Sequence, residues 1–134
     1  MSNLTTVLTT TKRQLHWLNV QSIHEVNQAS MQYVDICQRH ASHKKWVLLV
    51  NPEGEAIAAL NDLPHLDKSK ILKVNTTKTP VSFDNIKSAL CKGNCSAVVL
   101  CNPCLKQQEI AELQKYARLG KTECVVLTNN KTIH

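Results

Sequence analysis

The sequence predicts an α/β domain with a parallel sheet of about four strands and helices on both faces. Four short segments, at 46–50, 71–75, 97–101 and 124–128, carry most of the apolar residues between the helices. They are nearly continuously apolar rather than alternating, which is typical of strands buried on both faces. Segments with apolar residues at helical spacing separate them, so strand and helix alternate along the chain.

The N-terminal residues are expected to lie outside this domain. Residues 1–21 are rich in Thr, Asn and Gln and are interpreted as a mobile segment that ends in a docking segment. From Ser22 to about His43, apolar residues recur at helical spacing, and Ser22 with Glu25 three residues later has the form of a capping box. We therefore expect a single domain over 22–134 that opens with a helix.

Three further helices are predicted after the first strand. They span residues 56–61, 83–90 and 105–119. Asn51, Pro52 and Gly54 supply turn chemistry before the first of them. Gly93 and Gly120 follow the other two and are placed to terminate them.

The composition is that of a globular domain. The chain has 134 residues, of which 43% are hydrophobic and 19% charged. No apolar run approaches the ~20 residues needed to span a bilayer, and residues 1–11 lack the pattern of a secretory signal, so we expect a cytoplasmic protein. The three glycines belong to no nucleotide-binding motif, and the six cysteines are expected to be reduced thiols.

The positive charge is concentrated in one part of the chain. The net charge is +6, and Asp84 is the one acidic residue between Lys68 and Lys92, where six lysines occur. Such a field favours an anionic partner, which is either nucleic acid or the acidic face of another protein. A solvated lysine-rich face is the alternative interpretation.

Four stretches of the sequence resemble the SulA family of bacterial cell-division inhibitors. They are residues 45–48 (KWVL), 63–64 (LP) with 70–72 (KIL), 89–99 (ALCKGNCSAVV) and 109–113 (EIAEL) ending in Gly120. The match covers residues 45–127 without a gap. The resemblance implies a RecA-like core that lacks the phosphate-binding loop. It also implies a protein made in the SOS response to DNA damage, which binds the tubulin-like GTPase FtsZ and blocks its polymerisation and GTPase activity.

The resemblance also implies which residues bind the partner. They are Lys45 before the first predicted strand, Leu60 at the end of the following helix, and Lys70 at the start of the second strand, with Leu63 on the same face. The family often has Trp at the position of Leu60. We expect no enzymatic activity, catalytic residue, metal or cofactor, and we expect FtsZ, with a second copy of the chain also considered, as the partner.

Two other functions compete with this reading. Cys101-Asn102-Pro103-Cys104 follows a strand and precedes a helix, where thioredoxin-like proteins carry a redox pair, but too few elements follow it for that fold. The lysine-rich segment could instead follow the phosphates of a nucleic acid, although its one aromatic residue, Phe83, falls on the apolar stripe of a helix.

Metal sites are disfavoured by spacing. Cys95 and Cys101 flank one strand and would be about 20 Å apart, too far to share a zinc ion. Cys37, His40 and His43 are interpreted as helix surface.

Overall fold

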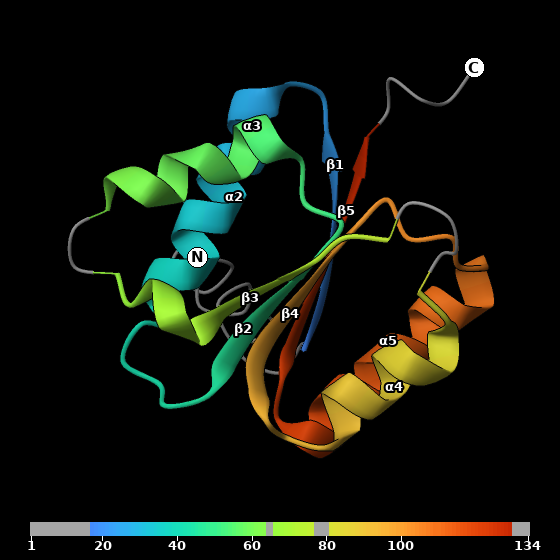
Figure 1. Cartoon of the computed structure of the whole chain (residues 1–134). Coiled ribbons are helices and arrows are strands. Elements are labelled where there is room, and N and C mark those ends of the chain that lie inside the picture. The colour runs from blue at the N-terminus through green and yellow to red at the C-terminus, as the bar shows by residue number, and fades with distance from the viewer. Residues whose placement is uncertain (1–16, 64–65, 77–80, 130–134) are drawn as a thin grey trace, which may run out of the picture.

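A five-stranded parallel sheet lies between two layers of helices (Figure 1). The computed structural model describes residues 17–63, 66–76 and 81–129. The strands are β1 (Leu18–Ile23), β2 (Trp46–Val50), β3 (Ile71–Val74), β4 (Cys95–Cys101) and β5 (Glu123–Asn129), and their order in the sheet is β1-β5-β4-β2-β3. The predicted α/β class with a parallel sheet is confirmed, and the sheet has five strands where about four were expected.

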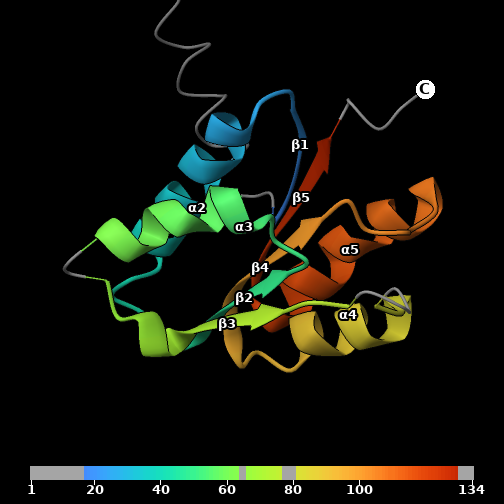
Figure 2. The same cartoon turned by 45° about the horizontal axis from the view of Figure 1, so that its top comes forward.

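The helices divide between the two faces of the sheet. They are α2 (Val26–Arg39), α3 (Gly54–Ile57), the 3-10 helices η1 (Ala58–Asp62) and η2 (Lys68–Lys70), α4 (Phe83–Cys91) and α5 (Gln107–Gly120). In both views α2 and α3 lie on one side of the sheet and α4 and α5 on the other (Figures 1 and 2). Helices on both faces were predicted, and the prediction is confirmed.

Two apolar cores result, one on each face. Every residue of the central strand β4 is buried, which explains its continuous apolar sequence. Strand β2 alternates between the cores, since Leu49 packs with Tyr33 and Ile36 of α2, whereas Val50 packs with Leu90 of α4. Each such buried side chain contributes about 1.5–3 kcal/mol through removal of apolar surface from water.

The edge strand β1 was not predicted. It pairs in parallel with β5, from Leu18 opposite Cys124 to Ile23 opposite Asn129. The predicted domain boundary at residue 22 therefore cuts through a strand of the sheet, and residues 1–16 lie outside the described residues. The first helix also begins later than predicted, because the capping box is formed by Glu25 and Gln28 and not by Ser22 and Glu25.

The carboxyl ends of α4 and α5 meet at a glycine. Gly93, with φ of 72°, follows α4 as predicted. Gly120, in contrast, is the last residue of α5, and the left-handed residue after the helix is Lys121, with φ of 53°. A Cβ atom on Gly120 would lie 1.7 Å from the carbonyl oxygen of Leu90. Gly120 is therefore required for close packing of the two helices and not for the turn.

Two asparagines tie neighbouring strands together at their carboxyl ends. Asn51 and Asn102 follow β2 and β4 with φ of 53° and 48°. The backbone N–H of Asn51 donates to the Val74 carbonyl oxygen at 2.7 Å, and that of Asn102 donates to the Leu127 carbonyl oxygen at 2.8 Å. The Asn51 side-chain oxygen also accepts a hydrogen bond from the N–H of Thr76 at 2.6 Å. The backbone N–H groups that follow β2 and β4 therefore already have hydrogen-bond acceptors within the fold.

Candidate partner-binding surface

The pairing of β2 with β3 brings two of the predicted site residues together. Val47 lies opposite Ile71, so Lys45 and Lys70 lie at the same edge of the sheet, at the amino ends of the two strands. The Lys70 ammonium donates a hydrogen bond to the Lys44 carbonyl oxygen at 3.2 Å. Both lysines line a shallow depression that we call the basic depression; its other members are Cys37, His40, Ala41, His43, Val47, Leu66, Asp67 and Ile71.

The positive charge at the amino ends of β2 and β3 is only partly neutralised by acidic residues of the chain. Asp67 accepts a hydrogen bond from the N–H of Ser69 at 3.1 Å. The hydrogen bonds from Ser69, with an added contribution from the Lys70 charge, lower the pKa of Asp67. Lys68 donates to the Asn61 carbonyl oxygen at 3.0 Å, which orients that ammonium without neutralising it. The amino ends of β2 and β3 therefore retain a net positive charge.

The lysine-rich segment predicted from the sequence is divided between two places. Lys68, Lys70 and Lys73 lie along the edge that carries β3. Lys87 belongs to α4, where its ammonium lies 5.0 Å from the ring centre of Tyr116, and Lys92 caps the end of that helix. Lys78 lies outside the described residues.

Leu60 is buried and does not share the surface on which Lys45 and Lys70 lie. Its side chain is 5% exposed and belongs to the core beneath α2. The 3-10 turn of η1 directs Leu60 inward while Ala58, Asn61 and Asp62 stay at the surface. Leu63 is half-buried and packs against the same core, one turn from Leu66 of the basic depression. Of the four predicted residues, Lys45, Leu63 and Lys70 are thus exposed or half-buried, and Leu60 is buried.

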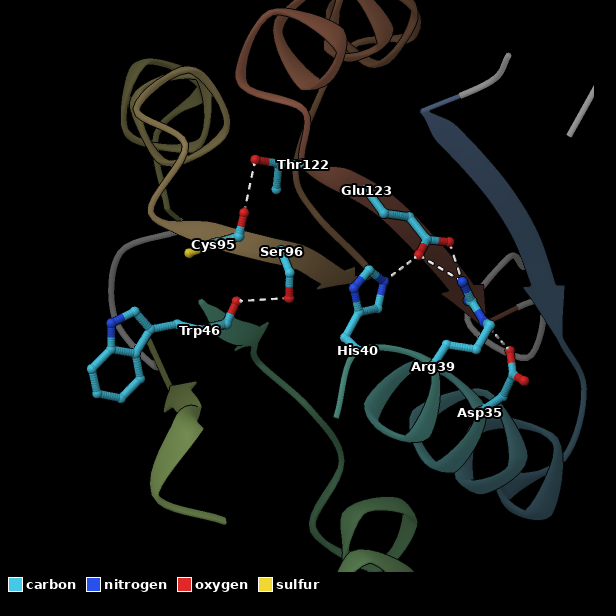
Figure 3. A network of polar contacts seen from close by, with 8 residues as sticks. All are labelled: Asp35, Arg39, His40, Trp46, Cys95, Ser96, Thr122 and Glu123. Carbon is cyan, nitrogen blue, oxygen red and sulfur yellow. Dashed lines mark hydrogen bonds and ion pairs between the residues drawn. The ribbon is translucent and has the colours of Figure 1, made fainter. Parts of the chain in front are cut away.

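An ion-pair network that the sequence analysis missed holds the end of α2 against β5 (Figure 3). The Arg39 guanidinium donates to both carboxylate oxygens of Glu123, at 2.8 and 3.1 Å, and to Asp35 at 2.9 Å. The ring Nε2 of His40 lies 2.7 Å from the same Glu123 carboxylate. Burial by itself would raise the pKa of Glu123, but the hydrogen bonds from His40 and Arg39 outweigh it and lower the pKa to about 2. The network holds His40, which is one of the residues that line the basic depression.

Trp46 is a second feature that the sequence did not reveal. It begins β2, next to Lys45, and 41% of its surface is exposed. Its backbone forms hydrogen bonds on both sides. Its N–H donates to the Asn94 carbonyl oxygen at 3.2 Å. Its carbonyl oxygen accepts from the Ser96 hydroxyl at 3.4 Å (Figure 3). The indole ring is therefore exposed at the start of β2, one residue after Lys45 in the chain, but it is not among the residues that line the basic depression.

The cysteines differ from a thioredoxin-like pair in their environment. Cys101 is buried, and its thiol forms a hydrogen bond with the Tyr33 hydroxyl. Burial raises the pKa of Cys101 to about 11, the opposite of what a nucleophilic thiolate requires. Cys104 is exposed. Cys95 and Cys101 lie at opposite ends of β4, as predicted, and Cys37 is a core residue rather than helix surface.

Within residues 17–63, 66–76 and 81–129, no helix has the length and apolarity to cross a membrane.

One comparison with known proteins bears on this geometry. The crystal structure of SulA from Pseudomonas aeruginosa superposes with a TM-score of 0.62 and covers 84% of this chain and 98% of that protein, at 16% sequence identity. This chain has a SulA-like fold. No protein-family model matches the sequence, and no curated protein matches it. The arrangement of strands and helices is therefore shared with SulA over nearly the whole length of that protein, while most side chains differ.

Proposed function

We propose that this protein is a SulA-like inhibitor of bacterial cell division that binds FtsZ in the cytoplasm and blocks its polymerisation during the SOS response. The observation that carries the proposal is the pairing of Lys45 and Lys70 at one edge of a SulA-like sheet. These are the positions that the family resemblance implies for the partner.

The proposed mechanism needs no chemistry from the inhibitor. A polymer of head-to-tail subunits stops growing when one of the two faces that each subunit must offer is occupied. The family resemblance implies that one FtsZ face carries acidic residues that complete the GTPase site of the next subunit. A basic surface of complementary shape would cover that face, and it would block assembly and GTP hydrolysis together.

Charge reversal at the basic depression tests the proposal. Sedimentation of FtsZ polymers with GTP should show loss of pelleted polymer when the wild-type protein is added. Lys70→Glu should weaken this effect about tenfold or more, and more at low than at high salt, because it reverses a charge that steers association.

The matched control is Lys115→Glu, which makes the same charge reversal on α5, an element outside the basic depression. It should retain most of the activity. If wild-type protein leaves the polymer pellet unchanged, the proposal is wrong; if Lys70→Glu inhibits as well as wild type, the site assignment is wrong.

Nucleic-acid binding is a second candidate, and the exposed Trp46 beside Lys45 favours it. An exposed indole can stack on a base while neighbouring lysines contact phosphates. A mobility shift with single-stranded DNA at physiological salt that disappears in Trp46→Ala, together with an unchanged FtsZ pellet, would favour this candidate over the first.

A further inference from the structure

One side-chain nitrogen of the basic depression has no hydrogen-bond partner among the described residues. It is Nδ1 of His40, which is buried. The other ring nitrogen, Nε2, lies 2.7 Å from the carboxylate of Glu123 (Figure 3). That contact fixes the orientation of the ring, because a flipped ring would place a carbon atom against the carboxylate. A buried polar atom without a partner is costly, so a ligand that supplies the missing hydrogen bond would gain binding energy here.

The contact with Glu123 also determines where the proton of the His40 ring lies. The pKa of Glu123 is lowered to about 2, so its carboxylate is ionised at neutral pH and accepts the hydrogen bond from Nε2–H. In the neutral ring Nδ1 then carries a lone pair and no proton. A second proton taken up at Nδ1 would make this nitrogen a donor and give the ring a positive charge.

The groups that face His40 from its own helix do not change charge near neutral pH. The Arg39 guanidinium is paired with Asp35 of α2 and with Glu123 of β5. Burial raises the pKa of the Cys37 thiol to about 11, so this thiol is neutral. The charge on this side of the ring is therefore constant.

The groups on the other side of the depression are charged as well. Lys45 precedes β2, Lys70 ends η2, and Asp67 caps the start of η2. Lysine and carboxylate side chains ordinarily keep their charge between pH 6 and pH 8. Of the residues that line the depression, the two histidines, His40 and His43, thus have the side-chain type that exchanges protons in this range.

The size of the depression limits what can enter it. Its volume is about 10 Å³, close to the space that one water-sized oxygen atom needs. A group seated there contacts the lining side chains, and Nδ1 is the polar atom of the His40 ring that is still unused. His43 is exposed, and its ring centre lies 5.2 Å from that of His40, so it can move aside to admit an oxygen atom.

From this combination we propose that the basic depression receives one carboxylate of FtsZ, and that His40 takes up a proton at Nδ1 and donates this N–H to the carboxylate. The inference rests on the proposed function and adds to it a third cationic residue and a dependence on pH. Lys45 and Lys70 attract the carboxylate throughout the neutral range, whereas His40 attracts it only when protonated. In the complex the imidazolium would lie between two carboxylates, with Glu123 on Nε2 and the partner on Nδ1.

The sign of the pH dependence follows from the two forms of the ring. Neutral His40 presents a lone pair, which repels a carboxylate oxygen, and protonated His40 presents an N–H, which binds it. Binding therefore favours proton uptake, and by reciprocity a lower pH favours binding. One proton taken up per complex changes the affinity at most about tenfold for each pH unit. The carboxylates of the partner, with an ordinary pKa of about 4, stay ionised at pH 6.

Two other ligands fit the depression less well. A zinc ion would need about four converging ligands, and within residues 17–63, 66–76 and 81–129 no group of three or more His, Cys, Asp or Glu side chains could hold a metal. A phosphate of a nucleic acid would meet the same lysines, but no Phe, Tyr or Trp lines the depression to stack on a base.

Proton uptake on binding tests the inference. Isothermal titration calorimetry with GDP-bound FtsZ at pH 7, in phosphate and in Tris buffer, gives the number of protons taken up per complex, because the two buffers differ in ionisation enthalpy. The dissociation constant is measured at pH 6, 7 and 8. The test variant is His40→Gln, whose amide can still donate to Glu123 but does not titrate. The matched control is His24→Gln, which removes an imidazole just after β1, outside the depression.

The expected results assign the proton to one residue. Wild-type protein should take up more than ~0.3 proton per complex and bind FtsZ about 5- to 10-fold more tightly at pH 6 than at pH 8. His40→Gln should lose most of this uptake and retain less than about a twofold pH dependence. His24→Gln should match wild type in both measurements. Protons exchanged by FtsZ itself are common to all variants, so the difference between wild type and variant isolates His40.

Four outcomes would overturn the inference. If wild-type protein does not bind FtsZ, the proposed function fails and this contact fails with it. If wild type binds and folded His40→Gln takes up as many protons, the assignment to His40 alone fails. If His43→Gln abolishes the uptake and His40→Gln does not, the proton is taken up at His43. If single-stranded DNA binds with the same uptake and FtsZ does not bind, the ligand is a phosphate.

A measurement on the wild-type protein replaces the variant if circular dichroism shows that His40→Gln is unfolded. Nuclear magnetic resonance follows the titration of the His40 ring in the free protein and in the FtsZ complex. The midpoint of the titration should rise in the complex, because the bound carboxylate favours the protonated ring. An unchanged midpoint would show that His40 does not respond to the partner.

Discussion

Replacement of Glu123 by Gln tests whether the network between α2 and β5 stabilises the fold through charge. The pKa of Glu123 falls from an ordinary 4.5 to about 2, and its side chain is 19% exposed. The difference of about 2.5 pH units corresponds to about 3 kcal/mol of stability at neutral pH, at ~1.4 kcal/mol for each unit.

The sign of the pH dependence follows from the lowered pKa. Above pH 4.5 the carboxylate is ionised in both the folded and the unfolded chain, and the full contribution is present. As the pH falls, the unfolded chain binds the proton first, so the contribution decreases and is lost as the pH passes about 2. About 2 kcal/mol of it should be gone by pH 3.

Urea unfolding at pH 7, 5, 4 and 3, followed by circular dichroism, measures this effect. The free energy of unfolding of wild type minus that of Glu123→Gln should decrease by about 2 kcal/mol between pH 7 and pH 3. The control, Glu112→Gln, removes an exposed carboxylate that forms no ion pair with the described residues, and its difference should stay within about 0.5 kcal/mol. A constant difference between wild type and Glu123→Gln over this range would refute the argument.

The remaining predictions concern packing and thiols. Gly120→Ala should destabilise the fold by about 3 kcal/mol or more in thermal or urea unfolding, because its Cβ would lie 1.7 Å from the Leu90 carbonyl oxygen; near wild-type stability would show that α4 and α5 can separate at no cost. Leu60→Trp should lower stability by about 1–3 kcal/mol, since a larger side chain must enter a filled core, and an unchanged unfolding midpoint would indicate that this position is at the surface. Replacement of both Cys101 and Cys104 by Ser should leave the proposed FtsZ inhibition intact with or without reductant in the sedimentation assay; a folded but inactive double variant would restore the redox interpretation.

The sequence predicted a strand best where both faces of that strand are buried. Strands β2, β4 and β5 lie inside the sheet, so their residues are apolar without alternation, and their positions were predicted to within about two residues. Strand β1 was missed, although the other edge strand, β3, was predicted. Its sequence LNVQSI mixes polar and apolar residues, and Ile23 is its one buried side chain. Its partner β5 is more than 100 residues away in the chain, so no local signal indicates the pairing.

The candidate site likewise contains residues whose position the sequence could predict and residues whose position it could not. Lys45 and Lys70 could be placed at one edge because adjacent parallel strands align their amino ends. The burial of Leu60 could not be predicted, because a four-residue helix followed by a 3-10 turn is too short to show a periodic apolar stripe. The contact of Arg39 with Glu123 was equally hidden, since it joins residues 84 positions apart.

The two edges of the sheet differ in how well they resist association with another chain. Each edge strand of a parallel sheet presents unpaired N–H and C=O groups that a second strand can use, and charged residues on the edge oppose this pairing. Strand β3 carries Lys73 and follows Lys68 and Lys70 directly. Strand β1 has no charged residue, and Val20 in its middle is 50% exposed. Aggregation of the folded protein at high concentration should therefore begin at β1. The substitution Val20→Lys should raise the concentration at which the protein aggregates.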